Sequence, residues 1–180
     1  YLGSPPRPHV ELAVSERARG AGIPTPRVLA AVVAPARPGY RAEIATEWLS
    51  PGHDLTALLL PGSYDDASRA GGLAAAGAAI GRAHATGLDH PDLNAGNLFL
   101  MPGELGAWSA SILDLDRAGF RDPPPPGDGP TGFARRNLER LERSIGKLRG
   151  AGRARWTEGD RAALLEGWRR GVAAAPGAGS

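Results

Sequence analysis

The residues with the clearest chemical potential lie in one short segment, HPDLNAGN, at positions 90–97. Asp92 and Asn97 are five residues apart in this segment. Transfer of a phosphoryl group to an alcohol requires a carboxylate that orients the hydroxyl or accepts its proton. It also requires oxygen ligands that hold Mg²⁺ against the phosphates. We therefore interpret Asp92 as a candidate catalytic base and Asn97 as a candidate ligand for the metal and the nucleotide.

A second acidic segment, SILDLD at positions 111–116, supplies the other half of such a site. Asp114 ends a β-prone run, and its carboxylate could be the second Mg²⁺ ligand and bridge to ATP phosphates. The spacing of Asp92 and Asn97 is that of the protein-kinase catalytic loop, H-R-D-L-x-x-x-N. Asp114 stands where the kinase D-F-G aspartate does, with Leu-Asp in place of Phe-Gly. Singly, these residues could cap a turn or end a strand, but their combined order favours phosphotransferase chemistry.

The surrounding segments must hold these residues in loops fixed at both ends. Apolar residues spaced by three and four, such as the stripe from Leu73 to Ala83, predict helices together with capping residues and glycine stops. Thr157 and Asp160 form a capping-box-like pair at the start of the last helix. The β-branched runs beside Pro-Gly turns predict strands. The predicted helices are 8–21, a short one from Asp54 to Leu60, 66–86, 133–148 and 157–172, and the predicted strands are 28–34, 41–48, 97–101 and 111–115. Because this order does not alternate strand and helix, it indicates an α+β fold and not a parallel sheet.

The residues upstream suit the nucleotide-binding side of a kinase. Glu11, on the first predicted helix, stands where a kinase glutamate pairs with a strand lysine that grips the phosphates. Glu47 and Leu49 fall where the linker between the lobes offers backbone groups to adenine. The ordinary alternatives are that Glu11 is an exposed acid on a helix and that the segment with Glu47 and Leu49 is the end of a strand. The only lysine is Lys147, far downstream, and no Gly-x-Gly-x-x-Gly loop is present. We therefore expect that the sequence is cut just before its first helix.

These features predict a protein-kinase-like fold, consisting mostly of the helical C-lobe with a partial N-lobe. The expected boundaries are 1–49 for the partial N-lobe, which holds the first helix and two strands, and 50–172 for the C-lobe. Residues 173–180 are expected to form a disordered tail. A chain of 180 residues is long enough for one packed core.

Composition excludes several classes of protein. The absence of cysteine excludes a disulfide framework, and no apolar run is long enough to cross a membrane. The formal net charge is +2, and basic residues alternate with acids, so we expect no nucleic-acid partner. One predicted helix carries a row of bases, Arg136, Arg140, Arg143 and Lys147. A solvated face is the ordinary interpretation of this row, and attraction to an anionic acceptor or lipid is the functional one.

Three motifs together resemble the bacterial 3-deoxy-D-manno-octulosonic acid (Kdo) kinases of the lipopolysaccharide kinase group. They are the His-x-Asp-Leu-Asn-x-x-Asn loop at 90–97, the Asp-x-Asp-Arg segment at 114–117 and the Arg-Asn-Leu-Glu-Arg-Leu-Glu-Arg-Ser segment at 136–144. The similarity runs from about residue 1 to 147. Pro91 and Leu115 depart from the expected pattern but leave the three oxygen-bearing side chains in place.

The resemblance implies ATP-dependent phosphorylation of the 4-hydroxyl of a Kdo sugar on a lipid A precursor, with ATP and Mg²⁺ as cofactors. By motif match, Asp92 would be the catalytic base, Asn97 and Asp114 the metal ligands, and Glu11 the lysine-pairing acid. The implied partner is an anionic, lipid-linked sugar. The implied location is the cytoplasm, with peripheral contact at the cytoplasmic face of the inner membrane and no transmembrane segment.

Two other functions use the same residues. A small-molecule phosphotransferase of the aminoglycoside type would share Asp92, Asn97 and Asp114, although Asn94 and the segment 136–144 argue against it. A truncated or pseudokinase-like module without turnover is favoured by the missing lysine and glycine-rich loop. A screen of phosphate acceptors distinguishes the first alternative from a Kdo kinase. A comparison of ATP turnover by the chain and by a version extended upstream tests the second alternative.

Overall fold

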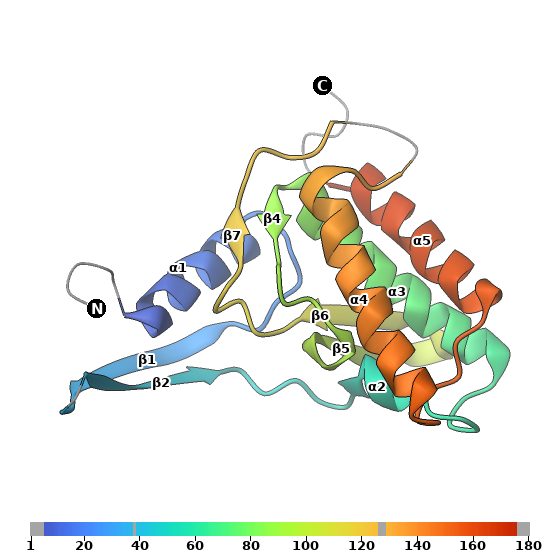
Figure 1. Cartoon of the computed structure of the whole chain (residues 1–180), viewed down its shortest axis with the longest axis horizontal. Helices are drawn as coiled ribbons and strands as arrows, with labels where there is room; N and C mark the ends of the chain where they lie inside the picture. The colour runs from blue at the N-terminus through green and yellow to red at the C-terminus, as the bar shows by residue number, and fades with distance from the viewer. Residues whose placement is uncertain (1–5, 38, 126–128, 176–180) are drawn as a thin grey trace.

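The computed structural model describes residues 6–37, 39–125 and 129–175. Figure 1 shows helix α1 and a two-stranded ribbon on one side and three long helices with a short hairpin on the other. The helices are α1 (Arg7–Gly20), α2 (Leu55–Leu58), α3 (Asp66–Ala85), α4 (Gly132–Gly150) and α5 (Glu158–Ala173). The strands are β1 (Val28–Pro35), β2 (Tyr40–Thr46), β3 (His53–Asp54), β4 (Leu88–Asp89), β5 (Leu98–Pro102), β6 (Trp108–Ile112) and β7 (Gly119–Phe120). The expected α+β class is confirmed.

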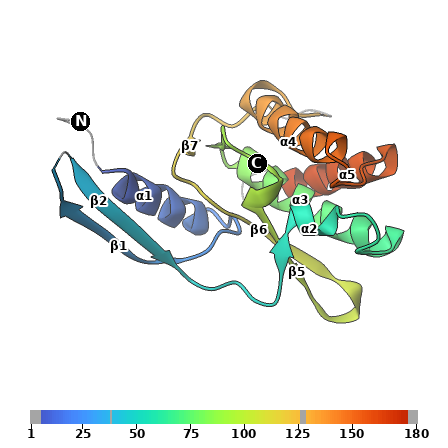
Figure 2. The ribbon, with the colours of Figure 1, turned by 60° about the horizontal axis from the view of Figure 1, so that its bottom comes forward.

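Strands β1 and β2 form an antiparallel ribbon, in which Val33 lies opposite Ala42. Helix α1 runs beside this ribbon in both views (Figures 1 and 2). The predicted hairpin is therefore confirmed, but β2 ends at Thr46 and not at Trp48. As a result, Glu47 and Leu49 lie in the link that leads from the ribbon to the helical region.

The core lies where α3 packs against the β5–β6 hairpin and the C-terminal helices. The predicted stripe of α3 is buried, with Leu73 and Ile80 at 0% and 1% exposure. Leu98 from β5 and Leu141 from α4 are fully buried in the same cluster. Since burial of one such side chain stabilises the fold by about 1.5–3 kcal/mol, this cluster holds the loops between its elements in place.

The backbones of α3 and α5 approach each other closely because glycines face the neighbouring helix. A Cβ atom on Gly77 would collide with the carbonyl oxygen of Leu164, and one on Gly167 would collide with that of Ala74. One turn further along, a second pair repeats the arrangement, Gly81 and Gly171. This packing explains how a segment composed mainly of alanine and glycine serves as the central helix of the core.

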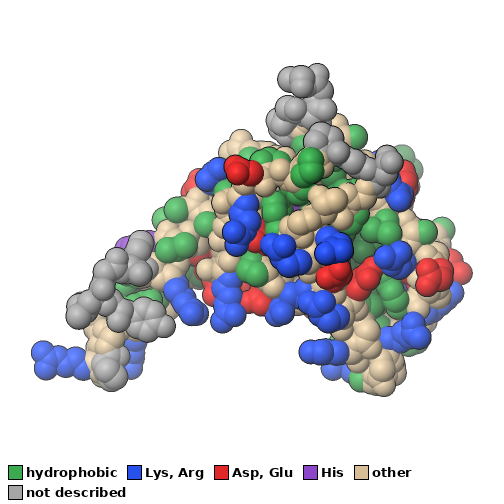
Figure 3. Space-filling model, turned by 45° about the horizontal axis from the view of Figure 1, so that its top comes forward, with side chains coloured by type: hydrophobic (Ala, Val, Ile, Leu, Met, Phe, Trp, Pro, Cys, Tyr) green, Lys and Arg blue, Asp and Glu red, His purple; other side chains and the backbone are tan. Residues whose placement is uncertain are grey.

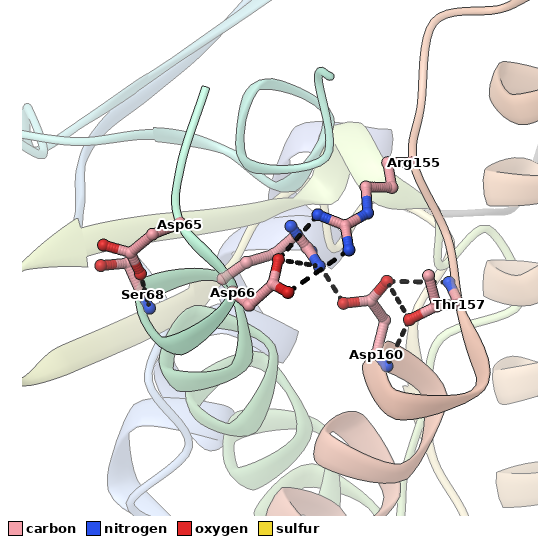
Figure 4. Close-up of polar contacts among 7 residues, drawn as sticks. Asp65, Asp66, Ser68, Arg155, Thr157 and Asp160 are labelled. Carbon is pink, nitrogen blue, oxygen red and sulfur yellow. Dashed lines mark hydrogen bonds and ion pairs between the residues drawn. The ribbon is translucent and has the colours of Figure 1, made fainter. Parts of the chain in front are cut away.

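A buried ion pair joins the N-terminal ends of the same two helices (Figure 4). Nε of Arg69 donates to Oδ1 of Asp160 at 2.8 Å, and the two side chains are 6% and 4% exposed. Asp160 also completes the predicted capping box with Thr157 at the start of α5. Arg155 adds an exposed contact of 2.7 Å to Asp66. The bonds from Arg69 and Thr157 satisfy the buried carboxylate of Asp160, which would otherwise be costly in the apolar interior.

Two strand pairs carry the segments that hold the candidate residues. The β4–β7 pair places Leu88 opposite Phe120, and the β5–β6 pair places Leu98 opposite Ile112. The strand expected at 111–115 was extended too far, because β6 ends at Ile112. Asp114 has a φ of +58°, a left-handed conformation that a strand does not contain.

The remaining expectations concern the membrane and the C-terminal tail. None of the helices within the described residues is both long and apolar enough to span a bilayer. Helix α5 includes Ala173, the first residue of the expected tail, and residues 176–180 lie outside the described part of the chain.

Candidate active site

The loop between β4 and β5 is folded around the backbone carbonyl of Asp92. This oxygen accepts hydrogen bonds from Nδ2 of Asn94 at 2.9 Å and from Nδ2 of Asn97 at 3.2 Å. Oδ1 of Asn94 in turn accepts from the backbone N–H of Gly96 at 2.9 Å. Asn94 therefore shapes the turn that brings Asp92 and Asn97 together, a role that the sequence did not reveal.

Two further bonds join this loop to the segment that carries Asp114. The backbone N–H of Leu113 donates to the carbonyl oxygen of Asn97 at 2.8 Å. Nε2 of the buried His90 lies 3.1 Å from the carbonyl oxygen of Leu113. Burial lowers the pKa of His90, so at neutral pH its ring is neutral and donates from Nε2. Asp114 follows Leu113 directly, and the structure thus places Asp92, Asn97 and Asp114 on two segments bonded side by side.

The backbone at Asp114 has a φ of +58°, in the left-handed region. A positive φ is uncommon for a residue with a side chain, and such residues concentrate at functional sites. Asp114 is exposed, whereas the neighbouring Ile112 and Leu115 are each 1% exposed. The apolar neighbours anchor the segment in the core, and the strained residue presents its acid to solvent.

Helix α1 brings Glu11 to the same acidic region. The half-buried carboxyl of Glu11 has a raised pKa, first because of burial and then because of the charges of Asp114 and Asp116. Arg7 on the same helix lies 3.9 Å from Asp116. The negative charges of Asp114 and Asp116 beside Glu11 create a negative potential that favours a bound cation.

Asp92 is held by two arginines, and neither contact was expected from the sequence. Nη2 of Arg140 on α4 lies 2.6 Å from Oδ1 of Asp92, and Nη1 of Arg117 lies 3.1 Å from Oδ2. Arg140 belonged to the basic row predicted for this helix, and Arg117 to the Asp-x-Asp-Arg segment. Their presence was visible in the sequence, but their convergence on one carboxylate depends on how α4 packs.

Glu47 and Leu49 lie in the link that follows β2. Oε1 of Glu47 accepts from the backbone N–H of Arg27 at 2.8 Å and from Nη1 of Arg19 at 3.4 Å. Leu49 is half-buried, and Trp48 between them is 90% exposed. Within the described ranges, no hydrogen bond or ion pair links Glu47 to the Asp92 loop.

The oxygen donors of Asn97 and Asp114 fit a magnesium ion that is shared with a nucleotide. Because Nδ2 of Asn97 donates to the Asp92 carbonyl, Oδ1 of the same amide is available as a ligand. The described residues contain no group of three or more His, Cys, Asp or Glu side chains arranged to hold a metal. Mg²⁺ is typically bound by one or two carboxylates together with water and substrate phosphates, so such a sparse donor set is suitable.

Comparison with known proteins agrees with this geometry. The lipopolysaccharide kinase (Kdo/WaaP) family matches residues 4–168. The chain is 40% identical over 131 residues to a 3-deoxy-D-manno-octulosonic acid kinase from Xanthomonas oryzae, covering 71% of this chain and 45% of that protein. It is 34% identical over 165 residues to the enzyme of the same name from Actinobacillus succinogenes, covering 90% of this chain and 63% of the relative.

A solved structure described as WaaP in complex with acyl carrier protein has the same fold. Its TM-score is 0.65 at 21% identity, and the match covers 91% of this chain and 66% of that chain. The protein-kinase-like fold expected from the motifs is thus confirmed. The chain spans 45% and 63% of the lengths of the two curated relatives. By its motifs, its fold and its relatives, the chain belongs to the lipopolysaccharide kinase (Kdo/WaaP) family.

Proposed function

We propose that the protein transfers a phosphoryl group from ATP to the 4-hydroxyl of a Kdo sugar on a lipid A precursor. The observation that carries this proposal is the bonding of the two loops, in which Asn97 contacts the Asp92 carbonyl and pairs with Leu113. This arrangement supports a site that contains Asp92, Asn97 and Asp114, in the same order along the chain as the catalytic acid, the amide and the D-F-G acid of protein kinases. Family membership supports the choice of acceptor, since the curated relatives are named Kdo kinases.

In this proposal Asp92 positions the acceptor hydroxyl and receives its proton. Asn97 and Asp114 would hold Mg²⁺, which would neutralise charge on the phosphates. The γ-phosphoryl group would pass from ATP to the hydroxyl oxygen, and ADP would leave. Glu11 extends the negative potential beside Asp114 toward a cation near the phosphates. The link that contains Glu47 and Leu49 would offer its backbone to adenine, at the end of a partial N-lobe at 1–49 that is followed by a C-lobe at 50–172.

Basic side chains support a peripheral location at the cytoplasmic face of the inner membrane. Figure 3 shows Lys and Arg side chains in a band across the viewed face, with acids among them. On α4, the side chains of Arg136, Arg143 and Lys147 are exposed. Each base near an anionic membrane surface contributes about 1 kcal/mol of attraction. Such attraction would bring the active site to a lipid-linked acceptor.

The test is phosphate transfer from radiolabelled ATP by the 180-residue chain and by the whole product of its open reading frame. The acceptors are a Kdo-bearing lipid A precursor, the same lipid without Kdo, and an aminoglycoside. We expect Mg²⁺-dependent labelling of the Kdo-bearing lipid alone, with the phosphate assigned to the 4-position by NMR. Labelling of the aminoglycoside alone, or ATP binding without transfer to any acceptor by the whole product, would refute the proposal.

A further inference from the structure

We propose that Arg117 and Arg140 form a binding site for a carboxylate on the acceptor sugar, and so select an acidic sugar as substrate. The inference rests on the proposed function, because it assigns the acceptor side of the same active site. It starts from the two contacts to Asp92, in which each guanidinium takes a different oxygen of the carboxylate.

The two arginines are exposed enough to contact a second anion. A guanidinium carries five N–H donors in a planar fork that matches a carboxylate. The contact with Asp92 is made by Nη2 of Arg140 at 2.6 Å and by Nη1 of Arg117 at 3.1 Å. Their side chains are 47% and 58% exposed, against 26% for Asp92. Donors that are exposed beside a partly buried acid are available to a second anion.

The charge balance also favours an anionic ligand. Asp92 carries one negative charge and faces two positive charges, so the three side chains together are positive. Charge-assisted hydrogen bonds between guanidinium and carboxylate are about twice as strong as neutral ones. An acceptor carboxylate would bring the net charge of this group to zero.

The position of the pair favours the acceptor over the triphosphate as the source of this anion. Both arginines contact Asp92, the residue proposed to lie against the acceptor hydroxyl. The acids Glu11, Asp114 and Asp116 gather where the metal and nucleotide are proposed to lie. A base must lie within about 2.6–3.2 Å of the hydroxyl that it serves. A carboxylate on the same sugar ring therefore falls near the guanidinium groups.

The experiment separates acceptor binding from turnover. Binding of the Kdo-bearing lipid A precursor in detergent is measured by calorimetry without nucleotide, beside an analogue whose Kdo carboxyl is reduced to an alcohol. The proteins are wild type, Arg117→Gln, Arg140→Gln and the control Arg135→Gln. Arg135 lies on the same helix as Arg140, and within the described residues its side chain makes one ion pair, an exposed contact of 3.7 Å to Glu139. Thermal melting verifies that each variant is folded.

We expect each of the two variants to bind the natural acceptor about 10- to 100-fold more weakly, the range for losing one hydrogen bond to a charged group. Wild type should bind the reduced analogue more weakly than the natural acceptor, by a similar factor. Arg140→Gln should not weaken the binding of the reduced analogue further. The control should match wild type, and KM for ATP should change little in any variant. Acceptor binding unchanged in both variants, or a raised KM for ATP alone, would overturn the inference. Failure of phosphate transfer with carboxylate-dependent binding intact would instead contradict only the proposed function.

Discussion

The side-chain oxygen of Asn137 accepts a hydrogen bond of 2.9 Å from the backbone N–H of His90. Its amide nitrogen donates to Oδ1 of Asp89 at 3.0 Å, and Asn137 is 2% exposed. Helix α4 therefore fixes the chain at the entrance to the Asp92 loop by two bonds in the protein interior. The same helix supplies Arg140 to Asp92, so its packing sets both the backbone and the charge of the candidate site.

Replacing Asn137 by alanine should destabilise the protein by about 2–3 kcal/mol, because it leaves a buried N–H and part of a buried carboxylate without partners. Urea denaturation followed by circular dichroism measures the change. Glu139→Ala is the matched control on an exposed turn of the same helix and should lie within about 0.5 kcal/mol of wild type. Equal stability of the two variants would show that the bonds to His90 and Asp89 are not significant.

Two glycine-to-alanine substitutions should have opposite effects on stability, because Gly167 faces the backbone of the neighbouring helix and Gly146 does not. Gly167→Ala places a methyl group against the backbone of Ala74 and should destabilise by about 1–3 kcal/mol. Gly146→Ala, on α4, meets nothing within 4 Å and should stabilise by up to about 1 kcal/mol through helix propensity. Melting temperatures of the two variants check the prediction. A stabilising Gly167→Ala would mean that the helices are further apart than described.

His84 predicts a loss of stability in mild acid. Nδ1 of its buried ring accepts a bond of 3.0 Å from Nε1 of Trp168, and burial lowers the pKa of His84 to about 4. The unfolded chain takes up this proton below about pH 6.5, whereas the folded protein does not until the pH approaches its own lower value. The contribution of His84 to the free energy of unfolding is therefore complete above the pKa of this group in the unfolded chain. That contribution decreases as the pH falls from that value toward the lower pKa of His84 in the folded protein.

Between about pH 7.5 and about pH 5, this single group should remove about 2 kcal/mol from the free energy of unfolding. Urea titrations at both pH values measure the loss in wild type and in His84→Gln, which keeps an acceptor for Trp168. The variant should lose less stability than wild type. Some dependence should remain, because burial also lowers the pKa of His90, while the raised pKa of Glu11 acts in the opposite direction. Identical losses in the two proteins would contradict the assignment.

The proposed roles of the two acids predict different kinetic defects in the whole gene product. Asp92→Asn should leave ATP binding near wild type and reduce turnover by orders of magnitude, because it removes the group that receives the hydroxyl proton. Asp114→Asn should weaken Mg²⁺-ATP binding itself, because it removes a charged metal ligand. Nucleotide titration and steady-state kinetics at several Mg²⁺ concentrations distinguish the two. A near-normal rate for Asp92→Asn would rule out its role as the base.

Local signals in the sequence predicted most of the long elements. The helix expected at 66–86 is α3, Asp66–Ala85, and the expected capping box of Thr157 and Asp160 begins α5. These features depend on residues within one or two turns of each other, so they can be predicted without knowledge of the tertiary structure. The two-residue strands β4 and β7 were missed, because so short a pairing has no periodicity to detect.

The sequence alone determined the order and spacing of Asp92, Asn97 and Asp114, the absence of cysteine and the family resemblance. Tertiary structure decided what surrounds them: the bond from His90 to Asn137, the positive φ at Asp114 and the two arginines on Asp92. Arg140 is 48 positions from Asp92 along the chain. A contact over that separation depends on the packing angle of α4, which the burial of Leu138, Leu141 and Ile145 sets and which no local pattern encodes.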